Sequence, residues 1–254
     1  KVASANSISI VNGGQTTVSL FRCYRREIEI SEINVPLKLV VIKTEDELRK
    51  KGLLDSISRF SNTQNKVNNA DRLAMEPPHI ELQESSKDSK FFVNGKGWFY
   101  ERRRGEVTTL NISDPLLHAQ FSSRFPKENV MDSTVLAKMW NSWLGMPEVG
   151  ASGKTKAFQT YHTQLQLKMH KTNWSPDSHH SNSVALWLMY KHMYYYIGKN
   201  YSALRGASLP HVIGWFSHLT EGRLDLSDIQ RKGKLSPAVE RCLESLVGPV
   251  DSLI

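Results

Sequence analysis

A glycine-rich turn near the start of the chain is the first segment whose residues could bind a ligand. In chain order it reads Asn12-Gly13-Gly14-Gln15-Thr16-Thr17. Glycines allow close backbone approach, and the N–H groups that open a helix point outward towards an anion. We expect this turn to bind a phosphate group, and an ordinary turn that starts a helix remains the alternative. No lysine follows the glycines, so the turn is not a Walker phosphate loop.

An amide-rich run at residues 61–68 is the second candidate, and its central side chains are Asn62, Gln64 and Asn65. Each amide can donate and accept hydrogen bonds, so such a cluster can orient a base or a sugar. A solvated loop has the same composition, and both interpretations stay open.

Three consecutive arginines, Arg102, Arg103 and Arg104, form the third candidate. A guanidinium group suits bidentate contacts with phosphate or carboxylate. The rings at 98–100 just before them could pack in a core or stack on bases. Side chains alternate along a strand, so at least one arginine is expected to point away from its neighbours. A basic sheet edge that resists strand pairing is the alternative explanation.

Acidic residues beside these motifs give weaker support for catalysis. Hydrolysis of a nucleotide or phosphodiester would need carboxylates that hold Mg²⁺, and Asp71 and Glu101 are the candidates. No acid pair has a recognisable metal spacing, and the histidines, His179-His180 included, lack the spacing of a metal site. A phosphate loop at 153–155 is excluded because Glu148 stands where the motif requires glycine. We therefore predict a binding site without a resident metal and rank an enzyme second.

The elements that must position these residues indicate an α+β first half and an all-α second half. In the first half we expect strands at 7–11 and 35–42, a hairpin at 91–100 that turns at Asn94-Gly95, and helices at 16–26, 46–59 and 71–76. In the second half we expect helices at 133–143, 154–170, 184–197, 208–219 and 237–247. A break is expected at 147–153, and Ser183 is the expected cap of the aromatic helix. The predicted domains are an α+β core at 1–130, a helical continuation at 131–172 and a helical domain at 173–254.

Composition narrows the class of protein. The chain has 254 residues, 39% of them hydrophobic and 23% charged, which excludes wholesale disorder. Its net charge of +8 favours a polyanionic partner. Two cysteines exclude a disulfide-stapled mini-protein and a four-cysteine zinc site, and they suit a reducing cytoplasm. No apolar run reaches the roughly 20 residues of a membrane span, and no signal peptide opens the chain. Because Lys1 is not a methionine, we expect the chain to begin inside a longer protein.

Four segments, taken in order, resemble the AIPR family, the abortive-infection phage-resistance proteins of bacteria. They are residues 10–17, 60–67 with Asp71 after them, 99–106, and 134–138 with Trp143 and then 147–158. The resemblance covers about residues 8–165. It implies a cytoplasmic bacterial defence protein, often encoded beside restriction–modification genes, whose relatives are longer at the N-terminus.

The glycine-rich turn is also distantly similar to the Asp-Gly-Gln turn of ParB/sulfiredoxin-like proteins, some of which bind or hydrolyse nucleotides. That similarity implies a ParB/sulfiredoxin-like fold for the first domain. Here Asn12 replaces the acid, and no arginine follows Gln15, so only a binding role carries over.

Together these features predict a defence module that binds nucleic acid or nucleotide phosphates. Gly13, Gly14 and the amides of Thr16 and Thr17 would cradle a phosphate, while the arginines neutralise charge and the amide run orients the ligand. A Mg²⁺-dependent nucleotide hydrolase or nuclease in the same pocket is one alternative. A scaffold that binds other defence proteins through the helix at 184–197 is another. An exposed helix there would favour the scaffold, and a buried one would argue against it.

Overall fold

The structure is a computed structural model, and two compact units make up the chain, residues 1–67 and residues 68–254. The residues that it describes are 10, 13–36, 38–42, 44, 46, 49–50, 52–54, 56–57, 69–170, 174–201 and 208–252. None of the helices in these ranges is long and apolar enough to cross a membrane.

Helix α1, Gly14–Arg25, is the main element of the first unit and confirms the helix predicted there. It begins after Gly13, whose φ of 84° lies in the left-handed region that glycine adopts without strain. Its end is a Schellman turn, in which the Ile28 N–H donates to the Cys23 carbonyl at 3.0 Å. Glu27 holds the left-handed position of that turn with a φ of 54°.

Two other predictions for the first unit have different outcomes. A helix is predicted at 46–59. Its described residues between 49 and 57 are helical, which confirms that part of the prediction. The predicted strand at 35–42 is wrong, since its described residues have no regular structure and Leu39 is 59% exposed. A β-branched run becomes a strand only where another strand accepts its hydrogen bonds, and the described residues of this unit supply none. The predicted strand at 7–11 lies outside the described residues except for Ile10.

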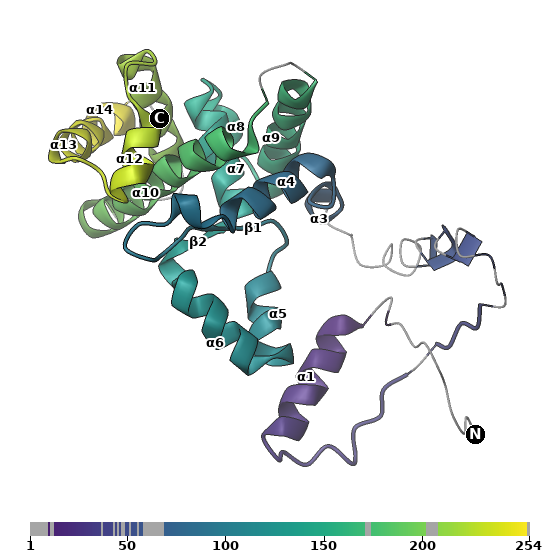
Figure 1. Ribbon diagram of the computed structural model, residues 1–254. Coiled ribbons are helices and arrows are strands. Elements are labelled where there is room, and N and C mark those ends of the chain that lie inside the picture. The colour runs from purple at the N-terminus through teal and green to yellow at the C-terminus, as the bar shows by residue number, and fades with distance from the viewer. Residues whose placement is uncertain are drawn as a thin grey trace. The chain divides into compact units, whose positions relative to one another are not determined.

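Residues 68–254 form a mainly helical unit that contains one small sheet (Figure 1). Its α-helices are α3 Asn69–Leu73, α4 Pro77–Ser86, α5 Glu106–Ser113, α6 Pro115–Arg124, α7 Ser133–Trp143, α8 Pro147–Ala151, α9 Lys154–Met169, α10 Pro176–Asn200, α11 Ser208–Thr220, α12 Leu226–Lys232, α13 Pro237–Ser245 and α14 Val247–Asp251. Two 3₁₀ turns, η1 Ser89–Phe91 and η2 Lys127–Asn129, complete the list. The fold class is therefore α+β, and the expected ParB/sulfiredoxin-like type stays a prediction.

Strands β1, Phe99–Glu101, and β2, Val130–Asp132, pair in parallel and bring Glu101 opposite Asp132. The predicted hairpin at 91–100 is therefore wrong as a strand pair. Its turn at Asn94-Gly95 does form, with φ values of 52° and 72°, and a single bridge closes it. Turn residues predict where a chain reverses, but β1 pairs instead with a strand that returns after α5 and α6.

One hydrophobic core joins the helices of this unit. It contains residues from Ala70 to Val250, so it includes residues on both sides of positions 130 and 172. The domain boundaries expected at those positions stay predictions.

Three details correct the predicted helix ends. The helix predicted at 71–76 is α3, which already ends at Leu73 before α4 begins at Pro77, and the expected break at 147–153 contains α8. Ser183 is not a cap, because α10 already begins at Pro176 and is capped by Ser175. The buried Ser183 hydroxyl accepts a hydrogen bond from Trp140 Nε1 at 2.9 Å and donates one to the His179 carbonyl at 2.7 Å. Ser183 therefore serves the packing of α10 against α7.

Candidate functional site

The carboxyl ends of β1 and β2 bring the arginine turn, residues 102–105, beside two carboxylates. Glu101 ends β1, and Asp132 ends β2 in register with it. The Ser133 hydroxyl donates to the Arg102 carbonyl at 3.1 Å and so ties the turn to the start of α7. Carboxyl ends of parallel strands are a common place for ligand sites.

Arg102 is the half-buried member of the three arginines and is held by the protein itself. Its Nε donates to Gln83 Oε1 at 2.8 Å, and its Nη1 donates to the Ala74 carbonyl at 3.1 Å. Gln83 Nε2 in turn donates to Glu106 Oε2 at 2.9 Å and to the Tyr100 carbonyl at 3.1 Å. Arg102 thus fixes the turn against α3 and α4, and part of its donor capacity is used within the fold.

Arg103 and Arg104 are the exposed members of the turn, and they lie after the end of β1, so strand alternation does not apply to them. Arg103 forms an ion pair with Glu106 at 3.4 Å, and its side chain remains 49% exposed. Arg104 makes no ion pair with any residue that the structure describes. Both guanidinium groups are therefore accessible to an anionic ligand.

The two strand-end carboxylates act as helix caps. Glu101 Oε1 accepts the Val107 N–H at 3.1 Å, at the start of α5. Asp132 Oδ1 accepts the N–H groups of Thr134 and Val135 at 2.8 and 2.9 Å, at the start of α7. Burial raises the pKa of Glu101, and the charges of Asp132 and Glu106 raise it further, against the opposing Val107 hydrogen bond.

The other predicted catalytic residue, Asp71, lies exposed in the first turn of α3. Across the described ranges, no three His, Cys, Asp or Glu side chains are grouped so that they could hold a metal ion. Of the two predicted catalytic residues, Glu101 is therefore the one that keeps the Mg²⁺-dependent alternative open.

The glycine-rich turn lies in the first unit. The Thr17 N–H donates to the Gly13 carbonyl at 3.0 Å, and the Thr17 hydroxyl donates to the same oxygen at 3.2 Å. The Thr17 amide is thus part of α1, which corrects its predicted place in a phosphate cradle. Gly14 and Thr16 are exposed at the helix start, and Gln15 lies between them in α1. Four predicted binding residues lie outside the described residues: Asn12, Asn62, Gln64 and Asn65.

A model of one protein family, described as AIPR protein, matches residues 1–254. The chain belongs to the AIPR family. The family confirms the resemblance seen in the sequence and supports a bacterial anti-phage role in abortive infection for this AIPR protein. Comparisons with curated proteins and with solved structures give no match. The ParB/sulfiredoxin-like similarity stays a prediction.

Beneath the arginine turn, the AIPR protein has a buried histidine network that the sequence did not reveal. His79 Nδ1 and the Tyr100 hydroxyl lie 2.8 Å apart, and His79 Nε2 lies 3.1 Å from His162 Nδ1. Burial lowers the pKa of His79 to about 3, and the charges of His162 and Arg102 act in the same direction. These residues are far apart in the chain, so no local spacing could have indicated their contact.

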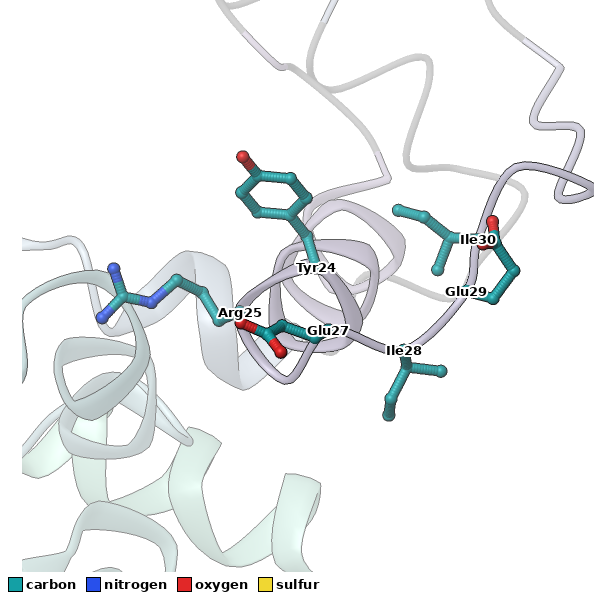
Figure 2. Close-up of a pocket in the computed structure, with 6 residues that line it drawn as sticks. All are labelled: Tyr24, Arg25, Glu27, Ile28, Glu29 and Ile30. Carbon is teal, nitrogen blue, oxygen red and sulfur yellow. The ribbon is translucent and has the colours of Figure 1, made fainter.

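The first unit also has an open recess where the chain leaves α1. Its lining residues are Tyr24, Arg25, Glu27, Ile28, Glu29 and Ile30. Figure 2 shows that their side chains diverge instead of converging on one centre. The recess follows from the Schellman turn and contains none of the predicted site residues, so the arginine turn is the better candidate.

Proposed function

We propose that this AIPR protein acts in abortive infection by binding the phosphates of a nucleic acid or nucleotide through its arginine turn. The observation that carries the proposal is that the three arginines have different surroundings. Arg102 is bonded to Gln83 and the Ala74 carbonyl, while Arg103 and Arg104 are exposed. A turn fixed in this way loses little freedom when it contacts a ligand, which favours binding.

Two further features support a polyanionic ligand. The whole chain carries a net charge of +8, and long-range attraction of this kind speeds encounter with nucleic acid. The exposed start of α1 at Gly14 and Thr16 stays a proposed phosphate-binding site of the first unit. Asn62, Gln64 and Asn65 keep their proposed role in orienting a ligand. A bacterial cytoplasmic location and contacts with other defence proteins belong to the same proposal.

The test is the salt dependence of binding, measured by fluorescence anisotropy with a labelled duplex. Three to five phosphate contacts predict a log–log slope of roughly −3 to −5. The double variant Arg103→Ala/Arg104→Ala should reduce the size of that slope by about 2, because each lost contact removes roughly 0.9.

The matched control is Arg223→Ala/Arg231→Ala, which removes two exposed arginines elsewhere in the same unit. This control should leave the slope near the wild-type value. Binding that does not respond to salt, or equal effects of the two double variants, would contradict the proposal.

Glu101 favours a second candidate, the Mg²⁺-dependent nucleotide hydrolase or nuclease. Its half-buried carboxyl group has a raised pKa and lies beside Asp132 and Glu106, an environment that active sites often use. Glu101→Gln keeps an oxygen that can accept the Val107 N–H, so it tests the charge and spares the helix cap. Unchanged turnover of nucleotide or nucleic acid in this variant would remove Glu101 from the chemistry.

The scaffold alternative receives less support. Of the helix at 184–197, the residues Val184, Leu186, Met189, Met193 and Ile197 are all completely buried. They are used in the core, which argues against an exposed apolar surface along the whole helix.

A further inference from the structure

The last turns of α10 carry a row of aromatic rings that leads from the core to the surface. Ring centroids lie 5.3 Å apart for Trp187 and Tyr190, 5.6 Å apart for Tyr190 and Tyr194, and 6.1 Å apart for Tyr194 and Tyr195. Trp187 is only 7% exposed, whereas Tyr194 is 37% and Tyr195 is 69% exposed. We call Tyr194, Tyr195 and the neighbouring Lys191 the tyrosine face.

The base of the tyrosine face is fixed to the start of the small sheet. Trp187 Nε1 and Lys191 Nζ both donate to the Glu128 carbonyl, at 3.1 and 3.2 Å. Burial lowers the pKa of Lys191, and the nearby Glu128 charge raises it. The row of rings is therefore held in place at its inner end, while its outer end is open to solvent.

Charge on this part of α10 has one sign. From Ser178 to Asn200 the sequence contains Lys191 and Lys199 and no aspartate or glutamate. Beside the rings, His192 Nε2 lies 2.9 Å from Glu244 of α13, and Tyr196 stacks on the His192 ring, so this neighbouring side of the helix is occupied. The tyrosine face thus combines exposed rings with positive charge, which is the combination that binds single-stranded nucleic acid.

We propose that the tyrosine face binds the bases of a single-stranded nucleic acid, with Tyr194 and Tyr195 as stacking partners and Lys191 and Lys199 near the backbone. This inference rests on the proposed function and narrows its ligand to single strands. Stacking tolerates any sequence, since every base has a flat π surface. A lysine beside the rings adds attraction to the phosphates.

The position of the face suits a strand that also contacts the arginine turn. Glu128 lies just before β2, and Asp132 at the end of β2 lies opposite Glu101, next to Arg102. Residues 128–132, the end of η2 followed by β2, span at most about 13 Å. A short oligonucleotide is long enough to contact both places.

The experiment compares a labelled 20-nucleotide dT strand with a 20-base-pair duplex, using the full chain and fluorescence anisotropy at one salt concentration. Tyr194→Ala/Tyr195→Ala should weaken binding of the single strand by about tenfold or more, since each stacked base contributes at least several-fold. Duplex binding should change by less than about twofold. Tyr194→Phe/Tyr195→Phe, which keeps the rings, should retain single-strand affinity.

Trp215→Ala is the matched control, because it removes a 46% exposed ring from α11. Equal losses in this control and in the tyrosine variant, or no loss in the tyrosine variant, would overturn the tyrosine face while Arg103→Ala/Arg104→Ala still tests the arginine turn. If wild-type protein binds neither the strand nor the duplex, the proposed function fails, and this inference fails with it. A tyrosine variant that changes only the oligomeric state would identify the face as a protein contact and overturn the proposal.

Discussion

The glycine-rich turn and the arginine turn begin their helices in the same way, yet among the described residues only the helix after the arginine turn has a carboxylate bound at its start. Gly13 precedes α1 with a φ of 84°, and Gly105 precedes α5 with a φ of 77°. In each case a threonine four residues later, Thr17 or Thr109, donates its N–H and its hydroxyl to the glycine carbonyl. The two local structures are equivalent.

Their surroundings differ. At the start of α5, the Glu101 carboxylate accepts the Val107 N–H and fills the position where an anion would bind. At the start of α1, no carboxylate among the described residues contacts the amides of Gly14 or Thr16. Local geometry alone therefore does not decide whether a helix start is available to a ligand. A carboxylate from the preceding strand can occupy it first.

Lowering the pH is expected to produce the largest difference in stability between the two units. All nine histidines lie in the second unit, where burial lowers the pKa of His79 to about 3 and of His180 to about 4. A lowered histidine pKa means that the unfolded chain binds more protons, so its contribution is complete above about pH 6.5 and is lost as the pH falls. From pH 6.5 to 4.5, His79 alone should lower the free energy of unfolding by about 2.3 kcal/mol.

Urea unfolding at several pH values measures this loss. His79→Gln should flatten the pH dependence, and replacement of the exposed His218 by glutamine should leave it unchanged. A pH profile that is the same in wild type and His79→Gln would contradict the assignment.

The next largest effect on stability is expected from Arg102, whose role differs from that of Arg103 and Arg104. Arg102→Ala should lower the free energy of unfolding by about 2 kcal/mol, because it removes charged hydrogen bonds and leaves Gln83 Oε1 without its donor. Arg104→Ala should change stability by less than about 0.5 kcal/mol, as expected for an exposed site. Equal effects in chemical denaturation would show that the three arginines are equivalent, contrary to their hydrogen bonds.

Replacing the glycines should have the smallest effect on stability, and this effect should be the same in both turns. Gly13→Ala and Gly105→Ala each place a β-carbon on a left-handed residue, and an added Cβ at either position meets no atom within 4 Å. Only backbone strain remains, so each variant should lose about 1 kcal/mol. Thermal unfolding of the two variants tests whether the turns are locally equivalent. A loss at one position alone would contradict that equivalence.

Helices with a clear apolar period were predictable, and contacts between distant segments were not. The helix predicted at 133–143 is α7, Ser133–Trp143, whose apolar residues Leu136, Met139 and Trp140 are buried and whose cap is Asp132. The sequence also identified Gly13 and the three arginines as candidate phosphate-binding residues. It did not indicate that Ser183 would bond to Trp140 inside a helix pair, because a polar residue can serve a loop or a buried hydrogen bond equally well.

By itself the sequence determined the family, the main helices, the glycines of the turn at 12–17 and the excess of positive charge. These follow from short-range patterns, since helix period, capping and positive φ depend on residues within a few positions. Only the tertiary structure decided that β1 pairs with β2, that Glu101 closes the start of α5, and that Arg102 serves the fold while Arg103 and Arg104 face solvent. Those outcomes depend on which donor and acceptor groups meet when the core forms, because leaving a buried polar group without a partner costs free energy.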